Sequence, residues 1–300
     1  MKCGACPVST PKVDTFYHED TGTFSYVVSD PATRQAAVID PVLDYCSSSG
    51  RTSTESVDAL LARVEQERLR VAWILETHAH ADHVTAAEYL QERTGAPIGI
   101  GAGIRYVQEN FRRTFNMGPD FPADGSQFDR LFADGDGFSI GELPVRVMTV
   151  PGHTDDSIAY RVGEDAVFVG DTLFRPDYGS ARCDFPGGDA GRLYDSVRRL
   201  FELPPETRLY LCHDYPAETA ERRSVTTVAE QREHNRHLRD GISREEFVRM
   251  REERDAGLGL PRLIIPAIQI NIRAGRLPPA EGNGVSYLKI PVDAFPGGGK

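Results

Sequence analysis

The segment from Thr77 to His83 concentrates residues that bind metals. It reads Thr-His-Ala-His-Ala-Asp-His, so the imidazoles of His78, His80 and His83 and the carboxylate of Asp82 fall within six positions. A neutral imidazole offers a nitrogen lone pair and a carboxylate offers hard oxygens, so alternate residues of a turn can converge on one divalent cation. Taken alone, Asp82 would be interpreted as a helix cap and each histidine as a solvated side chain. Together they predict a metal site.

Three further candidate ligands follow apolar, β-rich segments. They are His153, Asp171 and His213, and each comes at or shortly after the end of a predicted strand. Loop residues that a rigid sheet positions are frequent in functional sites. Because several strand ends can meet at one edge of a sheet, we expect these three side chains to join the histidine-rich segment.

The elements that must position these residues alternate between strands and helices, which indicates a mixed α/β fold. Consecutive strands without intervening helices between residues 137 and 170 are expected to pair antiparallel. Strands are predicted at 13–18, 24–29, 36–40, 71–76, 98–101, 137–140, 144–150, 157–162, 166–170 and 208–212. Helices are predicted at 55–68, 83–93, 104–115 and 190–201, followed by a charged helical region to about 255 and an apolar segment punctuated by prolines.

Composition excludes several classes of protein. With 40% hydrophobic and 26% charged residues, the 300-residue chain matches a globular protein and neither a disordered nor a fibrous one. The 45 acidic against 34 basic side chains give a net charge of −11, which argues against a general nucleic-acid binder. No apolar run approaches the ~18 residues that span a bilayer, and no secretory leader is visible, so we expect a cytoplasmic protein without a membrane partner.

The chain resembles the metallo-β-lactamase superfamily. The signature of that superfamily is present in full and in order, as a His-x-His-x-Asp-His segment followed by His153, Asp171 and His213. The resemblance implies an α/β fold of four αββα layers, with two mixed β-sheets and the metals at one edge of both. We expect a flexible N-terminal arm over 1–12, a single domain over 13–294 that includes a helical and apolar C-terminal extension, and a flexible tail over 295–300.

Within that superfamily, the chain is most similar to the persulfide dioxygenases and their bacterial β-lactamase-like relatives. The similarity rests on the segments THAHADHVTAA, GHTDDS, GDTLF, ARCDFPGG and CHDYP. It implies oxidation of glutathione persulfide by O2 and water to sulfite and glutathione, with one catalytic Fe(II) per chain held by His78, His153 and Asp171. Two histidines and one carboxylate on one face leave three positions on the iron open, which suits an Fe(II) oxygenase.

The other members of the superfamily signature, His80, Asp82, His83 and His213, have two interpretations. The resemblance to the dioxygenases implies that they surround the iron without binding it. The alternative is a second metal bridged to the first by Asp171, with zinc in place of iron. The runner-up function is accordingly a two-zinc thioester hydrolase of the hydroxyacylglutathione hydrolase (glyoxalase II) type. A non-catalytic metal-binding or sulfur-sensing protein is a third hypothesis.

Arg182 and Tyr215 match positions that contact glutathione in the dioxygenases. A guanidinium can hold a carboxylate with paired hydrogen bonds. The alternative is an arginine tied to Asp184 or Asp177 and a tyrosine packed at the sheet edge. The chain departs from some family members at Ser180, where they have a cysteine.

Three weaker signals are given little weight. The Cys3–Cys6 pair has redox spacing but lies in the predicted arm. His234 and His237 are expected on a solvated, charged helix face. The apolar C-terminal segment has two interpretations: it covers the core, or it forms a contact in a homodimer or homotetramer.

Overall fold

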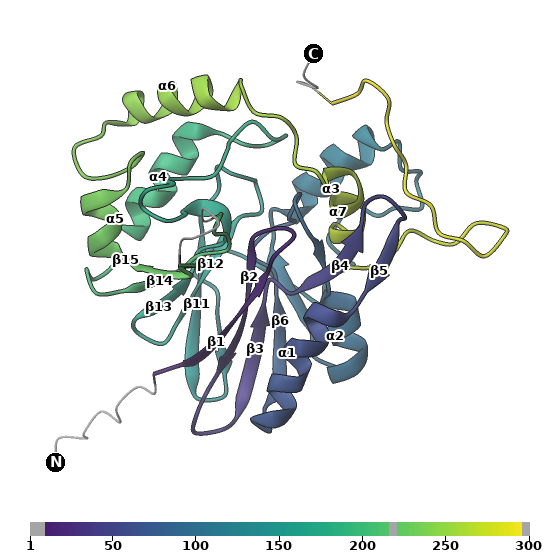
Figure 1. The fold of residues 1–300 in the computed structure, drawn as a ribbon, viewed down its shortest axis with the longest axis horizontal. Coiled ribbons are helices and arrows are strands. Elements are labelled where there is room, and N and C mark those ends of the chain that lie inside the picture. Colours follow the sequence, from purple (N-terminus) through teal and green to yellow (C-terminus); the bar gives the residue numbers. More distant parts are fainter. Residues whose placement is uncertain (1–9, 216–220, 296–300) are drawn as a thin grey trace.

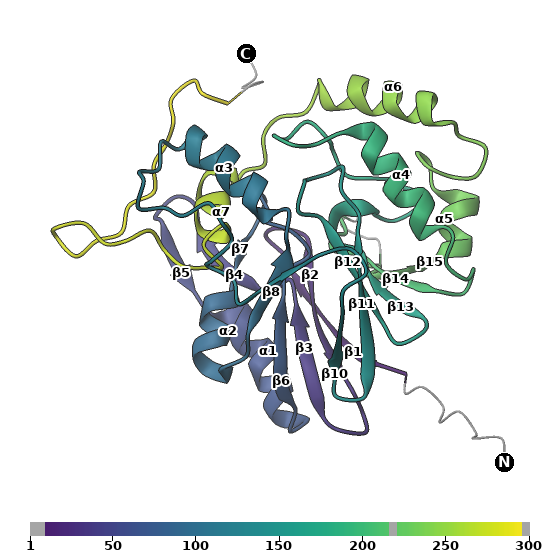
Figure 2. The same cartoon turned by 180° about the vertical axis from the view of Figure 1, so that it is seen from behind.

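The computed structural model describes residues 10–215 and 221–295. Two six-stranded sheets face each other, and helices cover the outer face of each, so the chain forms the predicted αββα sandwich (Figure 1). The two groups of helices remain on opposite sides when the molecule is seen from behind (Figure 2). The Cys3–Cys6 pair, most of the predicted arm and most of the predicted tail lie outside the described residues.

The first sheet has the order β1-β2-β3-β6-β8-β9. Strands β1 to β3 are antiparallel, whereas β3, β6, β8 and β9 run parallel, so the sheet is mixed as predicted. Its strands are β1 (Lys12–His18), β2 (Thr23–Ser29), β3 (Gln35–Ile39), β6 (Arg70–Leu75), β8 (Ile98–Gly101) and β9 (Arg130–Phe132).

The second sheet has the order β10-β11-β12-β13-β14-β15. The hairpin-connected strands β10 to β13 are antiparallel, as expected for strands without intervening helices, and β13 pairs with β14 in parallel. Its strands are β10 (Gly137–Ile140), β11 (Leu143–Thr149), β12 (Ile158–Val162), β13 (Ala166–Phe168), β14 (Arg208–Tyr210) and β15 (Val225–Thr227).

A third, three-stranded sheet was not predicted, and it changes the segment after the histidines. It joins β5 (Arg51–Ser53), β4 (Val42–Cys46) and β7 (Val84–Thr85). The prediction of a helix from His83 is wrong, because the β-branched Val84 and Thr85 pair with β4 and helix α2 begins only at Ala87. Asp82 therefore caps no helix.

The helices divide between the two outer faces. Helices α1 (Glu55–Gln66), α2 (Ala87–Thr94), α3 (Ile104–Thr114) and α7 (Ile264–Asn271) accompany the first sheet, and α4 (Ala190–Leu200), α5 (Val228–His234) and α6 (Arg244–Asp255) accompany the second. The predicted charged region to 255 thus resolves into β15, α5 and α6, and the apolar segment contains α7. Among the described residues, no helix is both long and apolar enough to cross a bilayer.

Apolar cores between and outside the sheets hold these layers together. Strand β2 shows how the alternation of side chains serves two of them: Tyr26 and Val28 face the core between the sheets, and Val27 faces the core under α1 to α3. Every residue of β2 is buried, as expected for a strand covered on both sides. A third core joins the second sheet to Leu193 of α4 and Phe247 of α6.

Candidate metal centre

The predicted metal-binding residues lie together, and they come from four different strand ends. The loop from residue 77 to 83 follows β6, His153 follows β11, Asp171 lies in a short 3-10 turn after β13, and His213 follows β14. All are buried except Asp82, which is partly exposed. The sheets thus bring together residues that are distant in sequence, as the strand-end positions predicted.

Two glycines allow these loops to approach closely. Gly170 has φ +53°, and a Cβ atom there would lie 2.6 Å from Oγ1 of Thr77. Gly152 has φ +139°, and a Cβ atom would lie 2.3 Å from the backbone nitrogen of Leu193. Both conformations disfavour other residues, and both positions are too crowded for a side chain. The glycines therefore set the positions of the ligands that follow them.

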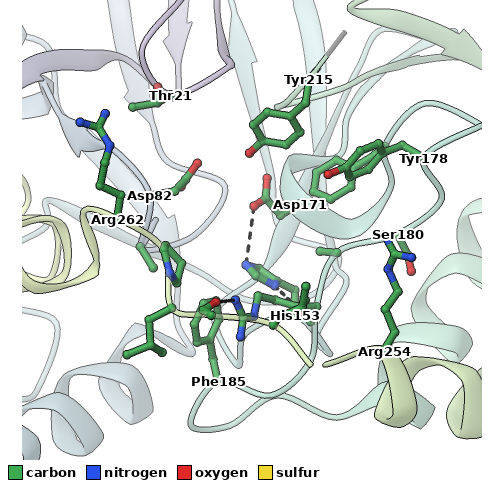
Figure 3. Close-up of a pocket in the computed structure, with 18 of the residues that line it drawn as sticks. Thr21, Asp82, His153, Asp171, Tyr178, Ser180, Phe185, Tyr215, Arg254 and Arg262 are labelled. Atoms are coloured by element: carbon green, nitrogen blue, oxygen red, sulfur yellow. Dashed lines mark hydrogen bonds and ion pairs between the residues drawn. The ribbon is translucent and has the colours of Figure 1, made fainter. Parts of the chain in front are cut away.

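The first group of candidate ligands is His78, His153 and Asp171, whose donor atoms all lie within 4.8 Å of one another. Nε2 of His78 is 3.8 Å from Oδ2 of Asp171, and Nε2 of His153 is 3.6 Å from the same oxygen. Figure 3 shows the His153–Asp171 contact as a dashed line at the centre of the site. The spacing is that of donors arranged around a common point.

Hydrogen bonds on the far side of each ring favour this orientation. Nδ1 of His153 donates to the carbonyl oxygen of Arg182 at 2.7 Å. Nδ1 of His78 contacts Oγ1 of Thr77 at 3.1 Å, and that hydroxyl donates to Asp40 at 2.9 Å, which leaves its oxygen free to accept. Both histidines are thereby favoured as Nδ1–H tautomers with the Nε2 lone pair directed toward Asp171, as metal-binding histidines commonly are.

The second group is His80, Asp82, His83 and His213, with donor atoms again within 4.8 Å of one another. Nε2 of His213 lies 3.1 Å from Oδ2 of Asp82 and 3.2 Å from Oδ1 of Asp171. Asp171 therefore lies between the two groups, one oxygen toward each. This geometry can serve one ion with a polar surround or two ions sharing Asp171.

The charges of the cluster are unevenly distributed. Burial opposes a charge on His213, yet Asp171 and Asp82 outweigh it and raise the pKa of that imidazole to about 10. Burial also opposes ionisation of Asp171, but His213 holds the pKa of that carboxyl well below its usual range. Burial and the neighbouring His80 lower the pKa of His83 to about 4. The carboxylates thus favour positive charge beside them, which a divalent cation would supply.

The donor atoms also fit a metal because many of them have no other partner. Among the described residues, seven buried donor atoms of the two groups make no hydrogen bond of good geometry: Nε2 of His78, His83 and His213, both ring nitrogens of His80, Oδ2 of Asp82 and Oδ1 of Asp171. Several of them have only ion-pair contacts, such as Nε2 of His213 with Asp82 and Asp171. Burying polar atoms without partners costs about 1 to 3 kcal/mol each. Coordination to a divalent cation would remove this cost, so the residues present fit a bound metal in either group.

Sequence reasoning missed two buried carboxylates that support the histidine loop. Asp40 accepts from the backbone N–H of Thr77 at 2.7 Å and lies 3.1 Å from Nε2 of His80. Although burial opposes the charge on His80, Asp40 raises the pKa of its imidazole to about 9. Asp156 accepts from the backbone N–H of Ala79 at 2.8 Å. Asp40 directly follows β3, so its place after a strand was the signal that could have found it.

A cavity of about 370 Å³ opens beside the first group. His153 and Asp171 form part of its lining, and Tyr215 and Tyr178 contribute aromatic walls (Figure 3). The ring of Tyr215 stacks on that of His213, with centroids 5.6 Å apart and planes 7° apart. The volume lies within the range of about 300 to 1,000 Å³ typical of sites for small molecules.

Two alternatives were predicted for Arg182, a place at the substrate and an ion pair with an aspartate, and its position in the structure is compatible with both. It lines the cavity, and its guanidinium also forms an ion pair with Asp184, with Nε and Oδ1 2.6 Å apart. It donates to the carbonyl oxygen of Gly259 at 2.6 Å and lies over the ring of Phe185 at 4.8 Å. Ser180 lines the same cavity. The charge of Arg182 is therefore already balanced within the wall.

The two late histidines differ from each other. His234 is exposed at the end of α5, as expected for a solvated face. For His237 that expectation is wrong, because it lies beyond the helix and is buried, and its Nδ1 accepts from the backbone N–H of Ser180 at 3.2 Å. Burial, followed by Arg251 and Arg254, lowers the pKa of His237 to about 4.

Residues 18–213 match the metallo-beta-lactamase superfamily. The chain is 51% identical over 292 residues to a probable metallo-hydrolase of Burkholderia pseudomallei, covering 94% of this chain and 99% of the relative. It is 47% identical over 283 residues to Glyoxylase B2 of Dictyostelium discoideum, covering 94% of this chain and 97% of the relative.

Persulfide dioxygenases are among the more distant relatives. The chain is 31% identical over 261 residues to the mitochondrial persulfide dioxygenase ETHE1 of Bos taurus, covering 86% of this chain and 87% of the relative. The crystal structure of ETHE1 from Myxococcus xanthus superposes with a TM-score of 0.71 at 36% identity, covering 88% of this chain and all of that one.

Proposed function

The chain belongs to the metallo-β-lactamase superfamily, and on that premise we propose that it is a persulfide dioxygenase. It would oxidise glutathione persulfide with O2 and water to sulfite and glutathione. The observation that carries the proposal is the set of two histidines and one carboxylate, His78, His153 and Asp171, with His153 and Asp171 facing a cavity of substrate size. The similarity to ETHE1 from Bos taurus and Myxococcus xanthus supports it.

We assign one Fe(II) per chain to these three residues. A pair of histidines with one carboxylate is the donor set typical of non-haem Fe(II) oxygenases. When bound, ferrous iron would supply the redox chemistry with O2 that protein side chains lack. The carboxylate supplies negative charge, and the hydrogen bonds to Thr77 and to the Arg182 carbonyl keep the Nε2 atoms of the two histidines available.

The remaining residues of the site position the substrate and exclude water. Phe174, Tyr178, Phe185 and Tyr215 supply aromatic surface to the cavity, which limits access of water to a reactive sulfur. Arg182 and Tyr215 belong to the wall that we assign to the substrate. In this proposal His80, Asp82, His83 and His213 surround the iron, and His213 helps to hold Asp171 in its ionised form.

A second candidate function is a thioester hydrolase with two zinc ions. The second group of donors, His80, Asp82, His83 and His213, favours it, because its unpartnered atoms also fit a cation. The names of two relatives, a probable metallo-hydrolase and Glyoxylase B2, support hydrolysis. Zinc is generally bound more tightly than ferrous iron by nitrogen and oxygen ligands, so affinity alone does not separate the two functions.

The two functions are separated by assaying one preparation in two metal forms. Metal-free protein is loaded under argon with either Fe(II) or Zn(II), and each form receives glutathione persulfide in air and, separately, a glutathione thioester. We expect sulfite from the iron form only, with one metal per chain. Thioester cleavage by the zinc form, with two metals per chain and no sulfite from the iron form, would reverse the assignment.

A further inference from the structure

The cavity beside the candidate metal centre carries more positive charge than the family resemblance implied. The arginines that line it are Arg182, Arg251, Arg254 and Arg262. Two of them are neutralised within the protein, since Arg182 pairs with Asp184 and Arg251 pairs with Asp255. Their charges stabilise the wall and are not available to a ligand.

Arg254 and Arg262 are different. Within residues 10–215 and 221–295, no carboxylate lies within 4.0 Å of either guanidinium, and the side chain of Arg262 donates only to the backbone oxygen of Asp20, at 3.2 Å. Both side chains are exposed. Figure 3 shows them on opposite sides of His153 and Asp171. A guanidinium without an acidic partner in a binding cavity is well suited to a ligand carboxylate.

The covalent structure of glutathione matches this placement. Its sulfur belongs to the middle residue, and each flanking residue ends in a carboxylate. A glutathione persulfide that directs its sulfur toward His153 and Asp171 must send its two ends outward in different directions. Arg254 and Arg262 line the cavity on opposite sides of His153 and Asp171, so one guanidinium is available to each end (Figure 3).

The surroundings of Arg254 and Arg262 differ, and the difference indicates which end of glutathione each arginine suits. Asp20 lines the cavity beside Arg262, and its carboxylate has no ion pair within the described part of the chain. A cation and an anion side by side are complementary to the α-carboxylate and α-ammonium of a γ-glutamyl residue. Arg254, on the last turn of α6, has no such carboxylate beside it in the lining, which suits the glycine end, where only a carboxylate is present.

We propose that Arg262 and Asp20 bind the γ-glutamyl end of the substrate and that Arg254 binds its glycine carboxylate. This inference rests on the proposed function for the identity of the substrate. It makes the segment from α6 to α7 the specificity-determining part of the site, because both arginines belong to it. Persulfides of free cysteine lack both distal groups and would bind more weakly than the tripeptide.

The test measures binding without turnover. The full-length, iron-loaded protein is kept under argon and titrated calorimetrically with S-methylglutathione, whose blocked sulfur cannot react. The variants are Arg254→Ala and Arg262→Ala, with Arg249→Ala as the matched control, since Arg249 is an exposed arginine of α6 outside the cavity. We expect each cavity variant to weaken binding roughly tenfold, the loss typical of one charged hydrogen-bonded pair, and the control to bind normally.

Two truncated ligands assign the ends. S-methyl-γ-glutamylcysteine lacks glycine, so Arg254→Ala should not weaken its binding further, whereas Arg262→Ala should. S-methylcysteinylglycine lacks the γ-glutamyl residue, so the pattern should reverse. The opposite pattern would show that glutathione binds with its two ends exchanged. Full affinity of both variants for S-methylglutathione would show that neither arginine binds the substrate, and it would leave the proposed function standing. If the wild-type protein binds no S-methylglutathione, both this inference and the glutathione substrate of the proposed function fail.

Discussion

The backbone and the side chain of Arg182 have different roles. Its carbonyl oxygen orients His153, while its guanidinium is balanced by Asp184. Substitution of the side chain leaves the carbonyl in place. A substitution of Arg182 therefore changes the cavity wall and keeps the carbonyl oxygen that orients His153, a candidate metal ligand.

We predict that Arg182→Ala retains its iron but raises the KM for glutathione persulfide about fivefold. The reason is that Asp184, which pairs with Arg182 of the cavity wall, is left unpaired, and its negative charge then opposes an anionic substrate in the neighbouring cavity by about 1 kcal/mol. The double variant Arg182→Ala/Asp184→Ala should recover most of the wild-type KM. Iron content and steady-state kinetics provide the measurements, and a double variant as impaired as the single one would instead assign Arg182 to direct substrate binding.

The buried His237 should make stability dependent on pH. Its native pKa of about 4 lies below the usual value near 6.5. Between these values the unfolded chain binds a proton at this imidazole and the native chain does not, so the free energy of unfolding falls as pH falls from 6.5 toward 4. The expected loss between pH 7 and pH 5 is about 1 to 2 kcal/mol, reduced for partial solvent screening.

His237→Gln keeps a side-chain acceptor for the Ser180 N–H but cannot titrate. Urea unfolding of both proteins at pH 7 and pH 5 should show a smaller loss of stability on acidification in the variant. Equal losses in the two proteins would show that other groups account for the pH dependence.

The candidate metal ligands could be predicted from sequence because four of them form one contiguous motif and the others follow strands. Asp40 shares that second signal and was overlooked. Arg254 and Arg262 could not be found in this way, because an arginine in a charged helix or a loop is normally solvated, and only the packing of α6 and α7 turns these two toward the cavity. The same limit applies to His237, which lies just beyond the helix predicted to expose it.

At the scale of elements, α6 supports the loop that carries Arg182. Arg251 is almost fully buried, pairs with Asp255 through Nε at 2.9 Å and donates to the carbonyl oxygen of Ser180 at 3.2 Å. Asp255 in turn accepts from the backbone N–H of Cys183 at 2.8 Å. The helix thus holds the loop on both sides of the carbonyl that orients His153.

Removing one partner of this pair should be costly. We predict that Asp255→Ala lowers the free energy of unfolding by about 3 to 5 kcal/mol, because it leaves the buried charge of Arg251 and the Cys183 N–H unpaired. Replacing both partners, as Arg251→Met/Asp255→Leu, should cost less than the single change. Urea denaturation measures the difference, with Glu252→Ala on the exposed face of α6 as control. A double variant less stable than Asp255→Ala would contradict this role for the pair.

The elements themselves were largely predictable, since periodicity identified most strands and helices within a few residues. The elements that were not predicted were missed for local reasons. Strand β7 has only two residues, too few to show a period, and it forms because it pairs with β4. Helix α7 carries a proline within its first turn and apolar residues on all sides, so it lacks an amphipathic pattern.

At the scale of the whole molecule, the metal centre joins the two sheets at one edge. We propose that residues 13–294 form one domain, so unfolding should be a single transition. The candidate ligands follow strands of both sheets, and several of their donor atoms lack a hydrogen-bond partner within the described part of the chain. Metal at a hundredfold excess over its dissociation constant would stabilise the native state by about 2.7 kcal/mol, which corresponds to a rise in Tm of roughly 5 to 10 °C.

Chelation should therefore lower the Tm in one step, and re-addition of Fe(II) under argon should restore it. Asp171→Ala removes the carboxylate that lies between both donor groups, so its Tm should not respond to metal, whereas Asp177→Ala, at an exposed loop position, should respond as the wild type does. Two separate transitions, or a normal response of Asp171→Ala, would contradict this description of the centre.

We propose that iron held by His78, His153 and Asp171 oxidises a persulfide in the adjoining cavity. Oxygen consumption by the iron-loaded protein, recorded with an electrode as glutathione persulfide is added, tests it most directly. We predict consumption that requires the persulfide, yields one sulfite per O2 and is lost in Asp171→Ala. Iron-loaded protein that retains its metal but consumes no O2 with glutathione persulfide would contradict it.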